Sequence, residues 1–125
     1  MRYLCMGYHE EQTWAALSVD VRKAMLADNA AYEALLRKNG HIVNMTALQR
    51  AQNAATLRFG NGKVSVTDGP FTETKEQLGG VVLIETIDLN HAIQLMSQLP
   101  CMRVGGSLEI RPIDADAYRE LSTEK

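Results

Sequence analysis

The sequence predicts one α+β domain over residues 1–125, with a ferredoxin-like antiparallel sheet and two helices on one face. Three observations predict this fold class. The length is that of one ordinary domain, and the chain contains no repeat or linker. Two long segments have the apolar spacing of amphipathic helices, and the shorter segments around them have the patterns of strands. The expected order is strand, helix, four strands, helix, strand.

The first expected elements are a strand over residues 1–8 and a helix over about 19–39. Residues 1–8 are apolar on both alternating sets apart from one arginine, which is typical of a central strand covered on both faces. Residues 9–17 show no clear period, so we expect a connecting loop with at most a helical turn. Ser18 is a favourable N-cap, and Asn39-Gly40 provides a stop.

The middle of the chain predicts short strands and a hairpin. Ile42-Val43 is the first candidate strand, and residues 54–59 and 63–67 both alternate between apolar and polar side chains. Gly60-Asn61-Gly62 between them is typical of a tight turn, because glycine and asparagine tolerate positive φ. The continuous apolar run over 81–85 predicts a second central strand.

The last elements are a helix over about 89–99 and a strand over 107–111. Asp88 is a good N-cap for the helix and Pro100 ends it. Residues 114–125 are rich in charge, and we expect a partly ordered C-terminal tail.

Composition excludes several classes of function. The chain is 46% hydrophobic and 22% charged, with a net charge of −2, and lacks the basic stripe of a nucleic-acid-binding protein. No segment approaches the roughly 20 apolar residues of a membrane span, so a cytoplasmic location is the default expectation. Cys5 and Cys101 have no metal-ligand spacing and are expected to be small buried hydrophobes. We therefore predict no metal, and no nucleotide or other cofactor motif is present.

Two helices on one face would leave the other face of the sheet uncovered. An exposed sheet face that carries tyrosine, methionine and valine would be a large apolar patch in water. A second copy of the chain is the simplest cover, so we expect a homodimer.

The segment over residues 68–80 (DGPFTETKEQLGG) is the most informative, and it is expected to be a long loop. Asp68 has two readings. It can shape the loop by accepting backbone N–H bonds, or it can serve as an acid–base group. It follows Val64 and Val66 on the same side of a regular strand, where burial would raise the pKa of its carboxyl group. Phe71 is expected to anchor the loop in the core.

Four further charged residues are candidate ligand-binding groups. Glu73 and Lys75 lie in the same loop, where Lys75 can hold an anion, although a solvated charged loop is the alternative. Glu109 and Arg111 alternate with apolar residues, so both project away from the core and form either an interface ion pair or a clamp for substrate. The Gly79-Gly80 pair is expected to act as a hinge or to allow close backbone approach.

Three blocks of sequence together resemble one known family. They are the opening MRYLCMGY, the segment DGPFTETKEQLGG over 68–80, and the closing SLEIRPI over 107–113. In this order they resemble the DGPF branch of the YCII-related family over about residues 1–113. The resemblance implies a ferredoxin-like domain that dimerises sheet to sheet into a dimeric α+β barrel, with a cleft between the protomers. Some members of the branch are associated with extracytoplasmic-function sigma factors.

The sequence departs from the family in its histidines. A His–Asp pair has been proposed as catalytic in the wider family, but the first helix here contains no histidine. The stretch over 102–106, where many members carry an Arg-x-His element, also lacks one. The resemblance therefore does not support histidine-based acid–base chemistry in this chain.

Three functions remain open from the sequence. The first is a small enzyme or small-molecule binder with its cleft at the dimer interface, which predicts that the candidate residues cluster around one pocket. The second is a non-enzymatic regulatory module that partners a sigma factor, and the third is a structural dimer without a ligand. The residues that the first function would bring together are Asp68 as the catalytic group and Glu73, Lys75, Glu109 and Arg111 as binding groups.

Overall fold

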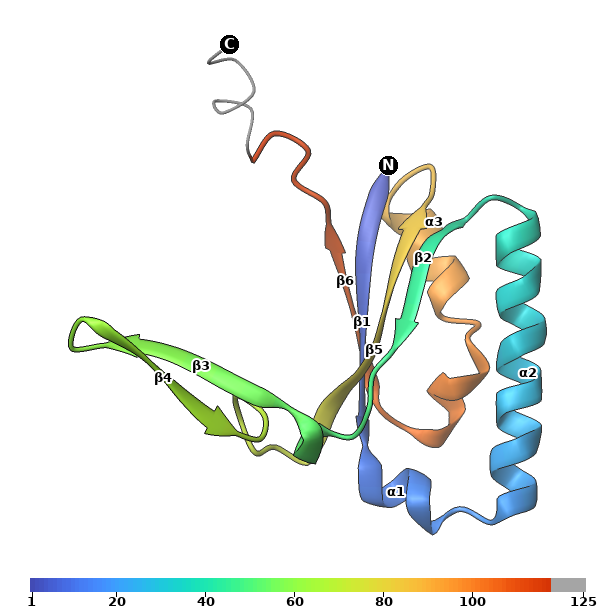
Figure 1. The fold of residues 1–125 in the computed structure, drawn as a ribbon. Helices are drawn as coiled ribbons and strands as arrows, with labels where there is room; N and C mark the ends of the chain where they lie inside the picture. The colour runs from blue at the N-terminus through green and yellow to red at the C-terminus, as the bar shows by residue number, and fades with distance from the viewer. Residues whose placement is uncertain (118–125) are drawn as a thin grey trace.

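The computed structural model describes residues 1–117, and it has an α+β fold with one antiparallel sheet covered on one side by helices. Figure 1 shows the two longest helices on the same side of this sheet, and a two-stranded hairpin that projects from the opposite side. The four strands of the sheet are arranged in the order β2-β5-β1-β6. This is the ferredoxin-like class that the sequence predicts.

The elements follow the predicted order with three short additions, α1, η1 and η2. The strands are β1 (Arg2–Glu10), β2 (Ile42–Ala47), β3 (Ala55–Gly60), β4 (Lys63–Asp68), β5 (Glu76–Glu85) and β6 (Ser107–Pro112). The helices are α1 (Glu11–Ala16), α2 (Val19–Lys38) and α3 (Leu89–Met96), with short 3₁₀ helices η1 (Ala51–Asn53) and η2 (Pro100–Val104).

The core lies between the sheet and helices α2 and α3. Alternate residues of the two central strands point towards the helices, and they are met by one side of each helix. The buried apolar residues are Tyr3, Cys5, Val82 and Ile84 from the strands, and Leu36, Ala92, Met96 and Leu99 from the helical side.

The predicted helix starts are confirmed by their hydrogen bonds. The Ser18 hydroxyl accepts from the Val21 N–H at 3.2 Å, and the Asp88 carboxylate accepts from the His91 N–H at 2.9 Å. Each bond satisfies one of the N–H groups that have no partner in the first turn of a helix. The α3 helix ends at Met96, three residues before the predicted end, and η2 follows from Pro100.

The predicted loop over residues 68–80 is too long, because β5 already begins at Glu76. The first half of β5 pairs with the second half of β1, from Gly7↔Gly80 to Glu10↔Glu76, with an irregularity between Gly7 and Tyr8. This pairing extends the second central strand by five residues beyond the apolar run over 81–85. The connecting loop is therefore restricted to residues 69–75.

The Gly79-Gly80 pair permits a close approach, as predicted. A Cβ atom at Gly80 would lie 3.1 Å from the Thr46 carbonyl oxygen, and one at Gly79 would lie 2.4 Å from the His9 ring. Side chains at these positions would push β2 or His9 away from β5.

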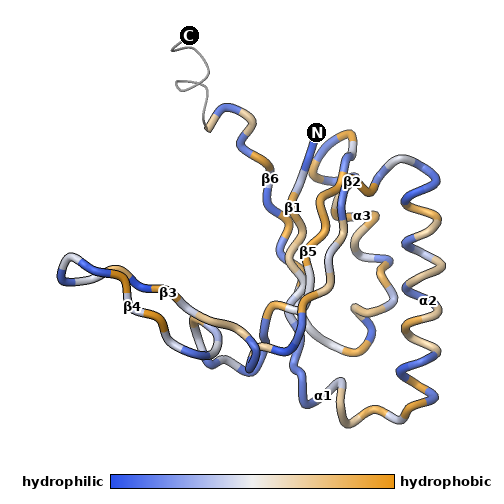
Figure 2. The backbone as a smooth tube through the Cα atoms, viewed as in Figure 1, coloured by the Kyte–Doolittle hydropathy of each residue, from blue (hydrophilic) through white to orange (hydrophobic). Residues whose placement is uncertain are grey.

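The hairpin of β3 and β4 is not part of the main sheet, contrary to the expectation of one antiparallel sheet. It forms a separate two-stranded sheet, which we term the arm (residues 55–68). Its tight turn is confirmed, since Asn61 and Gly62 have φ values of 52° and 77°. Figure 1 shows the arm extending from one end of the main sheet, and Figure 2 shows hydrophobic and hydrophilic stretches along it. A hairpin has the same alternation of apolar and polar residues whether it belongs to the main sheet or forms a separate sheet. The sequence pattern alone therefore cannot distinguish the two arrangements.

Residues 114–117 form a turn after β6, and the remainder of the predicted tail, 118–125, lies outside the described residues. Within residues 1–117, no helix combines the length and the apolar character needed to span a bilayer.

The packing predicts a strong effect of truncating Ile84, whose side chain is fully buried at 0% exposure. We expect Ile84→Ala to lower the free energy of unfolding by about 2–5 kcal/mol, because it removes apolar burial and leaves a cavity. Ile87→Ala, at a residue that is 78% exposed, is the matched control and should change it by less than about 0.5 kcal/mol. Urea unfolding of both variants at one protein concentration measures the difference, and equal effects would contradict the assigned core.

Candidate functional site

A hollow of about 540 Å³ lies where the arm joins the body, and we term it the arm-base hollow. Its walls come from Tyr8 on β1, from the connection that enters the arm (residues 48–51, 53 and 54), from the loop that leaves it (residues 70–72 and 74), and from residues 76–78 at the start of β5. The volume lies within the range of small-molecule sites. Segments far apart in sequence thus form one concave surface.

Hydrogen bonds hold the loop wall of the hollow against β5. The Gln77 amide donates to the carbonyl groups of Thr72 and Thr74, both at 2.9 Å. The Thr74 hydroxyl donates to the Glu76 carbonyl at 2.6 Å. These bonds shape a short loop that has little apolar burial of its own.

The opposite wall is tied to the body at two points. The Leu48 N–H donates to the Gly79 carbonyl at 2.9 Å, which fixes the start of the connection beside β5. The Ala51 N–H donates to the Glu11 carboxylate at 3.0 Å, so the first residue of α1 holds η1 in place. Helix α1 lies where the sequence predicts a connecting loop with at most a helical turn, and it helps to position the hollow.

Arg50 is the only cationic side chain that lines the hollow within residues 1–117. It is exposed, and its guanidinium group makes no hydrogen bond or ion pair to the described residues. By contrast, the Glu76 carboxylate accepts from the Ser107 hydroxyl at 3.2 and 3.3 Å. Arg50 therefore offers a set of N–H donors to a ligand, whereas the Glu76 carboxylate already accepts a hydrogen bond from Ser107.

Phe71 is not in the core, contrary to the prediction from the sequence. Its ring is 70% exposed and lies under the Arg58 guanidinium, 4.9 Å from the ring centroid. Arg58 also donates to the Phe71 carbonyl at 3.3 Å. A cation above the ring anchors this residue, which contributes an aromatic surface to the hollow rather than to the interior.

Asp68 lies at the base of the arm, beside the hollow but not in its lining. It pairs with Ala55 and faces the same side as Val64 and Val66, as predicted from strand parity. The side chain is exposed, so the expected apolar surroundings are absent in the single chain. Its carboxylate makes no hydrogen bond to any other described residue, which also removes the expected loop-shaping bonds. The neighbouring Gly69 N–H donates to the Ala54 carbonyl at 2.7 Å and closes the arm.

The other predicted binding residues fall into two groups. Glu73 and Lys75 are exposed in the loop over 69–75, between residues that line the hollow. Glu109 and Arg111 lie on β6, opposite Met6 and Leu4, and form an ion pair with 3.0 Å between the Arg111 Nε and Glu109 Oε2 atoms. The structure thus brings together the β6 pair, and none of the five predicted residues lines the hollow.

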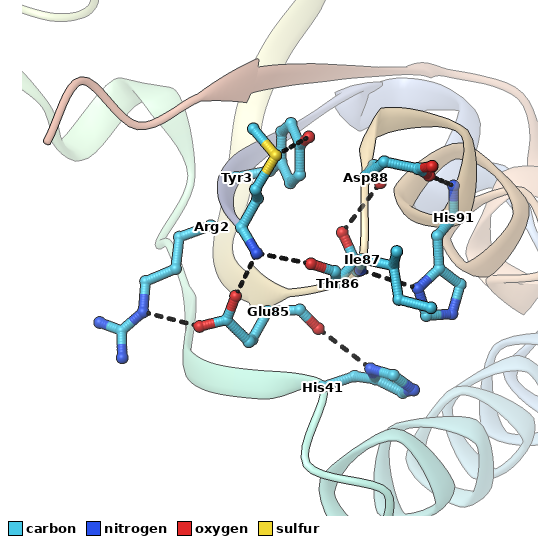
Figure 3. A network of polar contacts seen from close by, with 9 residues as sticks. Arg2, Tyr3, His41, Glu85, Thr86, Ile87, Asp88 and His91 are labelled. Atoms are coloured by element: carbon cyan, nitrogen blue, oxygen red, sulfur yellow. Dashed lines mark hydrogen bonds and ion pairs between the residues drawn. The ribbon is translucent and has the colours of Figure 1, made fainter.

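A second cluster of polar groups lies at the other end of the sheet (Figure 3). The Glu85 carboxylate binds the N-terminal ammonium at 2.6 Å and the Arg2 guanidinium at 3.3 Å. The His41 and His91 rings meet edge to face with centroids 5.1 Å apart, and each ring nitrogen Nδ1 bonds the backbone, at Glu85 and Ile87 respectively. These groups pair with one another, so the cluster joins β1, β5 and α3.

The thiols and potential metal ligands add no second site among the described residues. Burial raises the pKa of the Cys5 thiol to about 11 and also raises the pKa of Cys101, so both are protonated at neutral pH. No group of three or more His, Cys, Asp or Glu side chains in residues 1–117 is placed to hold a metal ion.

Comparison with known proteins agrees with the fold. The family model of the YCII-related domain matches residues 1–115. An uncharacterised protein of Rhizobium meliloti (strain 1021) is 33% identical over 114 residues, which cover 90% of this chain and 92% of that protein. A similar solved structure is 5-chloro-2-hydroxyhydroquinone dehydrochlorinase from Burkholderia phenoliruptrix AC1100, in complex with 2,5-dihydroxybenzoquinone. It is 16% identical with a TM-score of 0.54, and the match covers 91% of this chain and 94% of that one.

The four-stranded antiparallel sheet with helices on one face places the molecule in the ferredoxin-like α+β class. Within that class the chain belongs to the YCII-related family, because the family model matches nearly its whole length. The likeness to the dehydrochlorinase supports the fold alone at this level of identity.

The surroundings of Asp68 predict a small effect of its removal on stability. Because the carboxylate is exposed and makes no hydrogen bond to other described residues, we expect Asp68→Ala to change the free energy of unfolding by less than about 0.5 kcal/mol. Urea unfolding at a fixed protein concentration tests this value. A loss of about 1–3 kcal/mol would instead identify a buried hydrogen-bonding role, such as loop shaping.

The cluster around Glu85 predicts a pH dependence of stability. Hydrogen bonds from the N-terminal ammonium and from Arg2 lower the pKa of the Glu85 carboxyl group below its ordinary value of 4.5. The ionised Glu85 carboxylate therefore contributes fully to stability above about pH 4.5. This contribution is lost as the pH falls through the lower pKa that the carboxyl group has in the folded chain.

We expect Glu85→Gln to be less stable than the wild type at neutral pH, and the difference to shrink as the pH falls below 4.5. Thermal unfolding across the acid range measures this convergence. Glu73→Gln removes an exposed carboxylate with no partner among the described residues and serves as the control. A Glu85→Gln deficit that does not change with pH would show that the ion pairs are not its origin.

Proposed function

We propose that this protein binds a small planar organic anion in the arm-base hollow, with Arg50 as the receptor for its charge. The observation that carries the proposal is the Arg50 guanidinium, which lies in a concave site and has no partner among residues 1–117. A guanidinium presents N–H donors in a plane, which matches a carboxylate or two neighbouring oxygen atoms on a ring. The other described cationic side chains lie outside the hollow.

The remaining walls suit a ring-shaped ligand. Tyr8 and Phe71 contribute aromatic surface, and Leu48 and Leu78 contribute aliphatic surface. A mostly apolar wall with a few polar groups is typical of small-molecule sites. Hydroxyquinones have this shape and carry negative charge when ionised. The dihydroxybenzoquinone bound by the related dehydrochlorinase is therefore a suitable first probe.

The residues predicted from the sequence have proposed places around this site. Asp68 stands at the rim, and we propose it as the acid–base group if the bound molecule is transformed. Glu73 and Lys75 flank the lining residues of the loop and would act on the part of the ligand that leaves the hollow. The motif at 68–71 also supports assignment to the DGPF branch of the family.

We further propose that a second copy covers the sheet face opposite the helices, giving the dimeric barrel that the family resemblance implies. The Glu109–Arg111 ion pair lies on this face, on β6 beside the apolar residues of β1. A pair that is already formed can enter an interface without leaving an unpaired charge. The regulatory alternative has no observation in its favour, because none of these similar proteins is described as a partner of a sigma factor.

A calorimetric titration with 2,5-dihydroxybenzoquinone tests the ligand proposal. We expect saturable binding to the wild type and an affinity reduced by about 10- to 100-fold in Arg50→Gln, since a hydrogen bond to a charged group contributes about 1.5–3 kcal/mol. Lys23→Gln, which removes an exposed charge on α2, should bind like the wild type. If the wild type does not bind, or both variants bind equally well, the proposal is wrong.

A further inference from the structure

The side chains that line the arm-base hollow include one of each charge within residues 1–117. Arg50 lies in the connection that enters the arm, and Glu76 is the first residue of β5. All the other lining residues of the described chain are neutral. A molecule inside the hollow therefore meets one cationic and one anionic group on the same concave surface.

Most of the neutral polar side chains in the lining already bond within the chain. The Asn53 amide donates to the Gln49 side-chain oxygen at 3.1 Å. The Gln77 amide donates to two carbonyl groups of the loop wall, and the Thr74 hydroxyl donates to a backbone carbonyl at 2.6 Å. The two charged side chains therefore dominate what the hollow offers to the polar groups of a ligand.

Glu76 keeps acceptor capacity although its carboxylate is hydrogen-bonded. The Ser107 hydroxyl lies 3.2 and 3.3 Å from the two carboxylate oxygens, and it has a single proton to donate. An ionised carboxylate offers about four lone-pair positions. No other side chain among the described residues donates to Glu76, so the remaining positions can accept from a ligand.

The strand register places a second carboxylate beside Glu76. Glu10 on β1 is its direct cross-strand partner, and the Glu10 side chain makes no hydrogen bond or ion pair to the described residues. Like charges directly opposite each other in a sheet repel. An anionic group brought to this wall would add a third negative charge, whereas a neutral O–H or N–H group would donate to a charged acceptor. This wall therefore disfavours anions and favours donors.

We propose that the arm-base hollow selects aromatic monoanions that carry a neutral hydrogen-bond donor opposite their charged group. The inference rests on the proposed function, because the charged group of the ligand binds Arg50 as described above. It adds a second contact, in which the donor of the ligand binds the Glu76 carboxylate and so orients the ring at both ends. Hydroxylated aromatic carboxylates and hydroxyquinones that are ionised once have this pattern. Dianions of the same shape are disfavoured, since their second charge would face Glu76 and Glu10.

Two probes of nearly the same shape test this selectivity. 4-Carbamoylbenzoate has one carboxylate and, at the opposite position of the ring, a neutral amide with N–H donors. Terephthalate has a second carboxylate at that position. In calorimetric titrations at neutral pH we expect the wild type to bind 4-carbamoylbenzoate at least about tenfold more tightly than terephthalate. This is the lower end of the range for a hydrogen bond to a charged group, because Glu76 is exposed.

Substitutions assign the preference to Glu76. Glu76→Gln keeps the shape of the side chain and removes its charge, so the affinities of this variant for the two probes should differ by less than about threefold. Glu33→Gln makes the same change on α2, outside the lining of the hollow, and should keep the wild-type ratio. Arg50→Gln should weaken the binding of both probes, because each presents a carboxylate to Arg50.

The possible outcomes separate this inference from the proposed function. Equal affinities in the wild type, tighter binding of terephthalate, or a preference that persists in Glu76→Gln would overturn the inference and leave Arg50 as the receptor for an anion. A wild type that binds 2,5-dihydroxybenzoquinone but neither probe would also overturn it. A wild type that binds none of the three molecules would overturn the proposed function, and the inference with it.

Discussion

The structure depends first on the pairing of β1 with β5 along their whole length, from Arg2↔Glu85 to Glu10↔Glu76. This ladder places Tyr3 and Ile84 side by side under the helices, and its ends meet two different polar arrangements. At one end Glu85 holds the start of β1. At the other, the extension of β5 to Glu76 brings the loop beyond it next to Tyr8 and forms the arm-base hollow. The Glu85 cluster and the arm-base hollow thus lie at the two ends of one pair of strands.

The sequence predicted the elements whose signals are local. Helix caps at Ser18 and Asp88 and the turn at Asn61-Gly62 depend on the chemistry of one or two residues, and the structure confirms them. The start of β5 was missed because its first residues, Glu76 and Gln77, are polar and carry no apolar period. The separation of the arm was missed because alternation within a hairpin does not report which sheet the hairpin joins.

The candidate site was predicted less well, for a physical reason. Strand parity predicts that Asp68 faces the same side as Val64 and Val66, and the structure confirms this, but its burial depends on surroundings that parity does not define. Arg50 was missed because a single arginine in an irregular connection carries no periodic signal. Its importance arises from the fold, which places it in a hollow where no other described residue pairs with it. Phe71 was expected inside because aromatic residues usually are, yet Arg58 provides an alternative contact outside.

Both covalent connections between the arm and the body run through the walls of the hollow, one over residues 48–54 and the other over 69–75. A change in the direction of the arm would therefore move two walls of the hollow. A molecule that fits one width better than another favours one direction of the arm. By thermodynamic linkage, a partner that restrains the arm in that direction would raise the affinity of the hollow for the molecule, and the molecule would raise the affinity for the partner by the same factor.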